Sequence, residues 1–255
     1  MARFRSGLSR GNRRRCGGEG RRVHSYRFDD IPAGGTASAG ACRCRHLGWG
    51  RLMFYTTDTN QHGLPHDPFK AIVAPRPIGW IGSKGREGSL NLSPYSFFNA
   101  ISDRPKLVMF SSSGRKDSLR NVEETGVFTA NLVSRHLVDR MNASSAPVAY
   151  DVDEFALAGL TAVDGRVVDA PFVGEALAVL ECRVTQIQQL RDIDGEPADS
   201  WMVIGQVMAI HIDETIIHDG RIDMGLARPV ARMGYMDYCD GGSDVFQLQR
   251  PSTAP

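Results

Sequence analysis

The sequence predicts a mainly β protein in which an antiparallel β-barrel carries a few short helices. Several segments after residue 53 alternate apolar and polar residues, as strands with one buried face do. Polar, glycine-bearing turns separate neighbouring segments of this kind, which is typical of β-hairpins. The helical segments between them are short and do not alternate regularly with strands, so a parallel βαβ sheet is not expected.

The first predicted hairpin covers residues 78–93. Residues 78–82 are apolar and β-prone, residues 84–88 form a polar turn with two glycines, and residues 90–93 alternate again. Because proline cannot donate a ladder hydrogen bond, Pro94 should end the second strand or leave it at a sheet edge.

A strand, a loop and a helix are predicted next. Residues 106–111 are mostly apolar and should form a strand, and residues 111–116 should form a polar loop. Asp117 is the expected N-cap of a short helix that ends near Thr125. Gly126 then suits the left-handed residue that commonly follows a helix.

The remaining elements are three strands and a short helix. Residues 127–132 alternate, which predicts a strand with one buried face, and residues 136–142 have the pattern of a short helix. Residues 178–185 alternate as a second half-buried strand. A polar loop over residues 191–200 leads to a strand over residues 201–213, so the last two strands should form a long hairpin.

The charge distribution divides the chain near Met53. The formal net charge is +1, but residues 1–52 contain twelve Arg and three acids and carry +9, whereas the remainder carries −8. The first segment is poor in apolar periodicity, so it cannot bury enough surface to offset its ordering entropy. We therefore expect a disordered Arg/Gly-rich extension over residues 1–52, one domain over residues 53–249 and a short tail over residues 250–255.

Three explanations remain open for residues 1–52. Targeting peptides are Arg-rich and acid-poor, and a basic arm can bind nucleic acid. The third explanation is a start codon assigned too early, with Met53 as the true beginning. We favour the third because the segment has no regular amphipathic pattern and the fold-like sequence begins only after it. For the domain itself we expect no nucleic-acid partner.

Membrane, secretory and metal-binding roles have little support in the sequence. No run of 18 apolar residues is present, and no secretory signal peptide precedes the domain. Of the five cysteines, Cys182 and Cys239 alone belong to the domain, which is no disulfide framework and suits a reducing cytoplasm. His62 and His66 have no nearby carboxylate pattern, so we expect no metal site.

The first candidate binding segment lies between a predicted strand and a predicted helix. A helix N-terminus presents unpaired N–H groups and the positive end of the helix dipole. Serine hydroxyls can donate to phosphate oxygens, and cations can neutralise the phosphate charge. The segment therefore predicts a site for a phosphorylated ligand, and the alternative is a solvated loop with an ordinary Asp cap. The side chains concerned are Ser111, Ser112, Ser118, Arg115 and Lys116.

The second candidate segment covers residues 91–99. A flavin ring needs a mostly apolar slot with a few well-placed donors. Tyr95, Phe97 and Phe98 alternate with serine and asparagine side chains and can supply both. The alternative is a core strand whose aromatic rings only pack.

With several further motifs, these two segments resemble the flavin reductase-like FMN-binding family. The resemblance covers most of residues 53–249 in the expected order and is therefore more specific than any single motif. The matching runs are PRPIGWIG (75–82), NLSPYSFFN (91–99), KDS (116–118), ETGVFTANL (124–132), DEF (153–155), GLT (159–161), LEC (180–182) and PVARMGY (229–235).

The resemblance implies a split β-barrel of Greek-key type, usually a homodimer, with FMN in a cleft near the dimer interface. It places the flavin ring and ribityl chain near Asn91, Tyr95, Ser96, Phe97, Phe98, Asn99 and the adjacent-strand residue Asn131. It places the phosphate near Ser111, Ser112, Lys116, Asp117 and Ser118. Asp117 would orient donors rather than touch phosphate, because two anions repel. Arg232 would reach the site or the interface.

The implied activity is that of an FMN-dependent oxidoreductase, with FAD as an alternative flavin. The chain has no GxGxxG fingerprint and no GxxxxGK[ST] loop, so NAD(P)H, as the expected electron donor, would stack directly over the flavin in an open cleft. Electrons would pass to free flavin, another small acceptor or oxygen, and a flavin-using monooxygenase could be a partner. The alternative is an FMN-binding electron carrier without turnover of its own. No side chain is named as catalytic.

Overall fold

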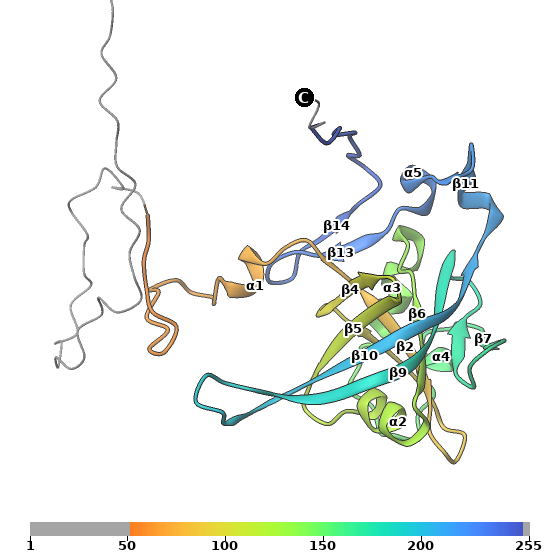
Figure 1. Ribbon diagram of the computed structural model, residues 1–255, viewed down its shortest axis with the longest axis horizontal. Helices are drawn as coiled ribbons and strands as arrows, with labels where there is room; N and C mark the ends of the chain where they lie inside the picture. The colour runs from red at the N-terminus through yellow and green to blue at the C-terminus, as the bar shows by residue number, and fades with distance from the viewer. Residues whose placement is uncertain (1–51, 252–255) are drawn as a thin grey trace, which may run out of the picture. The chain divides into compact units, whose positions relative to one another are not determined.

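The computed structural model describes residues 52–251 (Figure 1). Contacts divide the chain after Tyr55, and every element below belongs to the unit that begins at Thr56. The expectations for residues 1–51 lie outside the described residues. None of the helices found between residues 52 and 251 is both long enough and apolar enough to cross a bilayer.

The described residues are mainly β, as the sequence predicts. The strands are β1 (Arg76–Pro77), β2 (Gly79–Lys84), β3 (Leu90–Tyr95), β4 (Phe98–Asp103), β5 (Lys106–Ser113), β6 (Val127–Asn131), β7 (Ala162–Asp164), β8 (Pro171–Val173), β9 (Ala178–Arg191), β10 (Pro197–Ile212), β11 (Ile217–His218), β12 (Arg221–Ile222), β13 (Val230–Arg232) and β14 (Tyr238–Asp240). The helices are α1 (Phe69–Ile72), α2 (Asp117–Thr125), α3 (Val138–Ala143), α4 (Glu154–Leu157) and α5 (Met224–Ala227), with the 3-10 turns η2 (Arg135–Leu137) and η3 (Glu214–Ile216).

Seven strands form one antiparallel sheet in the order β3-β2-β6-β9-β10-β5-β4. β3 and β4 lie at its opposite edges, although only Ser96 and Phe97 separate them in sequence. Two residues bridge roughly 10 Å, whereas six strand spacings of about 4.8 Å would separate the edges of a flat sheet. The sheet must therefore curl until its edges approach each other. The result is a split barrel with Ser96 and Phe97 at the seam.

Both predicted hairpins are confirmed. β2 pairs with β3, and Pro94 lies opposite Trp80 on an edge strand, where a missing N–H is tolerated. β9 and β10 form the long hairpin, whose tip over residues 192–196 projects from the barrel (Figure 1).

The segment between β5 and α2 differs from the prediction in two respects. Ser112 and Ser113 continue β5 beyond the predicted end at Ser111 instead of forming a loop, because they pair with β10. Asp117 is not the N-cap: Lys116 holds that position in an extended conformation, and Asp117 is already helical. Gly126 follows the helix at φ 72°, as predicted.

β6 has two buried faces, so the prediction of a single buried face was wrong. Every residue from Phe128 to Asn131 is buried, because β6 lies between β2 and β9 and its outer face meets β8. The Thr129 hydroxyl donates to the Pro171 carbonyl at 2.6 Å. β9 departs from the half-buried pattern for a similar reason, since Glu181 on its polar face is fully buried.

Two apolar cores lie on opposite faces of the curled sheet. Adjacent residues Trp80 and Ile81 of β2 point to opposite faces and belong to different cores. One core joins Trp80 to Leu137 and to the residues of α3 and α4. The other joins Ile81 to Tyr95, Phe110 and the apolar face of α2. The sheet is thus packed on both of its faces.

Candidate functional site

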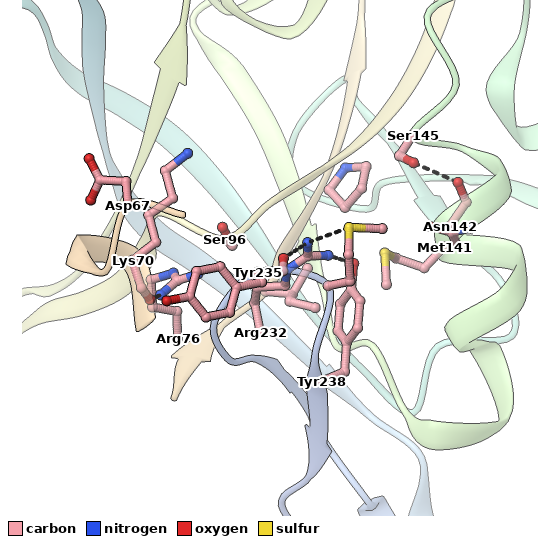
Figure 2. Close-up of a pocket in the computed structure, with 13 residues that line it drawn as sticks. Asp67, Lys70, Arg76, Ser96, Met141, Asn142, Ser145, Arg232, Tyr235 and Tyr238 are labelled. Carbon is pink, nitrogen blue, oxygen red and sulfur yellow. Dashed lines mark hydrogen bonds between the residues drawn. The ribbon is translucent and has the colours of Figure 1, made fainter. Parts of the chain in front are cut away.

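A cavity of about 560 Å³ lies beside the seam of the barrel (Figure 2). Its size falls within the range of small-molecule and cofactor sites. It is lined by Asp67, Lys70, Arg76, Ile78, Pro94, Ser96, Met141, Asn142, Ser145, Arg232, Tyr235, Met236 and Tyr238. These residues come from α1 and its approach, from the β1–β3 region, from α3 and from the segment around β13 and β14.

The cavity wall is positively charged. Lys70, Arg76 and Arg232 face a single carboxylate, that of Asp67. The Asp67 carboxylate accepts from the Phe69 N–H at 2.8 Å, and this bond comes first among the contacts that lower the Asp67 pKa. Among the described residues, none of the three cations forms an ion pair. The cavity therefore suits an anion.

Arg76 is the most unusual of the three cations, because its side chain is buried, with 7% exposure. Its guanidinium donates to the backbone carbonyls of Lys70, Val73 and Met233, the last at 2.9 Å. Its Nε atom has no partner among the described residues. A buried charge without a counter-ion is unfavourable, so a bound anion would stabilise this position.

Arg232 is held from the C-terminal side of the cavity. Its guanidinium donates to the Tyr238 hydroxyl and to the Tyr235 carbonyl, and it lies 4.4 Å from the centre of the Tyr238 ring. Figure 2 shows Arg232 between the two tyrosines. Arg232, which the family resemblance places at the site or the interface, thus lines the cavity.

Phe97 connects the cavity with the end of β5. Its ring lies 5.9 Å from Lys70 Nζ and 6.0 Å from Arg76 Cζ, within cation–π range. Its carbonyl accepts a hydrogen bond from Ser111 N–H at 2.8 Å. Two of the predicted segments, residues 95–99 and residues 111–118, are therefore adjacent in space.

The start of α2 presents free hydrogen-bond donors. The first-turn N–H groups of a helix, here including those of Asp117 and Ser118, have no intrahelical acceptors. No side chain caps this helix, so these N–H groups have no side-chain cap acceptor either. Lys116 is exposed, and Ser111 is half-buried at the end of β5. Ser112 is fully buried, and its hydroxyl donates to the Gly114 carbonyl at 2.9 Å. An anion can approach this end of the helix with a cation close by.

Three other predicted residues have side chains that bond to protein groups. The buried Ser118 hydroxyl donates to Asn91 Oδ1 at 2.6 Å, and Asn91 Nδ2 donates to Glu154 Oε1 at 3.0 Å. Burial raises the pKa of Glu154, which its hydrogen bonds partly oppose. Asn131 Nδ2 donates to the Trp80 carbonyl at 2.9 Å. These side chains shape the barrel from inside.

The aromatic residues of the second segment divide between core and surface. Tyr95 packs against Phe110 with the ring centroids 4.9 Å apart, and burial raises the pKa of the Tyr95 phenol. The Tyr95 hydroxyl is buried and has no hydrogen-bond partner within residues 52–251, although the hydroxyls of Ser118 and Ser112 lie near enough to oppose the pKa rise. Phe98 packs on the same core, whereas Asn99 is exposed on β4.

A family model described as "flavin reductase like domain" matches residues 73–224, more than half of the chain. The chain belongs to the flavin reductase-like family. An uncharacterized protein of Halalkalibacterium halodurans is 34% identical over 185 residues, which cover 71% of this chain and 88% of the relative. The family resemblance inferred from the sequence motifs is confirmed.

Solved structures of this flavin reductase-like type share the split-barrel fold. Nitrilotriacetate monooxygenase component B from Bacillus cereus has a TM-score of 0.70 and 27% identity, with 77% of this chain and all of that chain covered. Flavoredoxin of Desulfovibrio vulgaris has a TM-score of 0.59 and 25% identity, with 71% of this chain and 93% of that chain covered. The predicted fold is thereby confirmed.

Sequence reasoning missed most of the cavity wall of this flavin reductase-like domain. Arg76 lies in the matching run PRPIGWIG but was assigned no role, and Tyr235 ends the run PVARMGY. Lys70 and Tyr238 carry no local signal. Only Ser96 and Arg232 of the predicted binding residues line the cavity. The one signal in the sequence is the position of Arg76 between Pro75 and Pro77 in that run.

Proposed function

We propose that this chain is an FMN-dependent oxidoreductase that takes electrons from NAD(P)H and delivers them to free flavin, another small acceptor or oxygen. The observation that carries the proposal is the cationic cavity at the barrel seam, in a chain whose family is that of flavin reductases. The bound flavin supplies the hydride chemistry, and the protein supplies position and electrostatics.

The described residues fit FMN at two places. The exposed Lys116, Ser111 and the uncapped first turn of α2 offer a cation, a hydroxyl and N–H donors for a phosphate. Ser96 and Phe97, at the seam, offer a polar group and an aromatic surface for the ring. Ser118 would contribute its backbone N–H, because its hydroxyl is engaged by Asn91.

The buried network behind the seam would keep this arrangement rigid. Asn91 links Ser118 of α2 to Glu154 of α4, and Asn131 links β6 to β2 and β8. A side chain whose partners are fixed loses little further freedom when a ligand binds. Tyr95 and Phe98 support the same region from the core. We assign none of these residues a proton-transfer role.

The exposed apolar face of β10 supports a homodimer. Met208, Ile210 and Ile212 project from the same side of the strand and are each at least 40% exposed. Exposed apolar patches of this kind mark interaction surfaces. The occupant we propose for this patch is a second copy of the chain. We place the protein in the cytoplasm, where a flavin-using monooxygenase could receive the reduced flavin. The likeness to a monooxygenase component supports that partner.

The test begins with the absorbance spectrum of the purified protein and the mass of any released flavin. We expect a flavin spectrum, or uptake of FMN at micromolar concentration by the apoprotein. Steady-state oxidation of NADH and NADPH is then followed at 340 nm with and without free FMN or FAD. A folded protein that takes up no flavin would refute the proposal.

The alternative is an electron carrier, which the likeness to flavoredoxin supports. A carrier would hold flavin tightly and would show negligible NAD(P)H oxidation with free flavin as acceptor. Multiple turnovers per bound FMN would support the reductase and exclude the carrier.

A further inference from the structure

We propose that the cationic cavity binds the phosphates of the nicotinamide dinucleotide, whereas the FMN phosphate binds at the start of α2. This inference rests on the proposed function and specifies where the electron donor is held. It assigns Lys70, Arg76 and Arg232 to recognition of a second nucleotide.

The first step of the argument is charge. The cavity wall carries three cations and one carboxylate. Arg76 is buried, has no ion-pair partner among the described residues and leaves its Nε atom unsatisfied. A dinucleotide brings at least two phosphate charges, which would balance this excess. Guanidinium groups bind phosphate through paired, charge-assisted hydrogen bonds.

The second step is the separation of two anion-binding places. The Phe97 ring contacts the cations Lys70 and Arg76, whereas the Phe97 carbonyl accepts from Ser111 at the end of β5. Phe97 therefore contacts both the cations of the cavity and β5, the strand that leads into α2. One FMN phosphate can occupy only one of these places. Two phosphorylated ligands whose rings must meet at the seam account for both.

The third step is the composition of the remaining wall. Tyr235 and Tyr238 offer aromatic surfaces, and Met141 and Met236 offer flexible apolar contacts, which suit the flat rings of a nucleotide. Tyr235 adopts φ 54°, which is uncommon for a bulky residue, and its carbonyl accepts from Arg232. The strained turn thus fixes the Arg232 guanidinium in the cavity.

The test compares two classes of ligand, nicotinamide dinucleotides and flavins, in three variants. Lys70→Gln and Arg232→Gln remove charge from the cavity without touching the buried Arg76, and Arg104→Gln is the matched control, because that side chain is 95% exposed on the β4–β5 turn. Dissociation constants for NADP⁺ and NAD⁺ are measured by calorimetry on the FMN-loaded protein and on the apoprotein. Dissociation constants for FMN and riboflavin are measured by fluorescence quenching.

We expect each cavity variant to raise the dinucleotide dissociation constant about tenfold, as the loss of one charge-assisted contact does. The FMN constant should stay within about twofold of the parent value, and Arg104→Gln should change neither. If the cavity variants instead weaken the binding of FMN more than that of riboflavin and leave dinucleotide binding intact, the cavity holds the FMN phosphate and the proposal is wrong. Unchanged binding of every ligand overturns it as well. Failure of the wild-type protein to bind any flavin would refute the proposed function, while dinucleotide binding to the apoprotein would still report on the cavity.

Discussion

Replacement of Glu181 by Gln should destabilise the protein in a pH-dependent manner. Glu181 is fully buried on β9, and its carboxylate accepts from the N–H groups of Arg166, Val167 and Val168 at 3.0, 2.6 and 2.8 Å. His211 Nε2 lies 2.5 Å from Oε1. A Gln side chain keeps the size but turns an NH₂ group toward some of these donors.

The magnitude follows from the pKa of Glu181. Burial acts to raise this pKa, but the hydrogen bonds from His211 and from the three N–H groups outweigh burial and lower it from 4.5 to about 2. That change corresponds to about 3 kcal/mol of folding free energy. Because the folded-state pKa is the lower one, this stability is fully present above about pH 4.5 and is lost as the pH falls toward 2.

Urea unfolding at several pH values tests this reasoning. At pH 7 the E181Q protein should be less stable than the parent by about 3 kcal/mol, and the difference should shrink between pH 4.5 and pH 3. Glu87→Gln, at an exposed position, serves as the control and should change stability by less than about 0.5 kcal/mol. If the difference in the free energy of unfolding between E181Q and the parent is the same at pH 3 and pH 7, the buried charge is not what stabilises the contact of Glu181 with residues 166–168.

Three further predictions concern binding, packing and assembly. Lys116→Ala should weaken the binding of FMN about tenfold and the binding of riboflavin hardly at all, because riboflavin lacks the phosphate. Lys106→Ala, at an exposed lysine of β5, is the control. Equal losses of affinity for both flavins in fluorescence titrations would contradict the assignment. Gly79→Ala should lower the melting temperature by several degrees, because the added Cβ would lie 2.4 Å from Phe98 Cδ2 and overpacking costs about 1–3 kcal/mol; an unchanged calorimetric transition would show that Phe98 yields freely. Ile210→Glu should convert the proposed homodimer to monomer in light scattering, since a charge at a side chain now 48% exposed would be buried in the interface; a monomeric parent protein would refute the dimer directly.

The buried polar residues show why local reasoning assigns roles only in part. The motif around residues 91–99 predicts a binding region, and the structure brings Phe97 of that region next to Ser111. The same motif does not reveal that Asn91 bonds to Ser118 and Glu154 inside the barrel. A serine or asparagine has the same sequence signature whether its partner is a ligand or a distant side chain. Its partner depends on how the sheet closes.

The sequence by itself determined six of the seven strands of the main sheet, both hairpins, the α2 segment and the family, because these depend on alternation, turn residues and motif order over short stretches. It did not predict β4 or the short strands outside this sheet. Tertiary structure alone decided that β6 is buried on both faces, since periodicity cannot report what covers a second face. It alone brought Lys70, Arg76 and Arg232 to one cavity, because the contact of β1 with β13 joins segments more than 150 residues apart. The charge of that cavity depends on how α1, β1 and β13 meet in the fold, and no single segment of the sequence carries it.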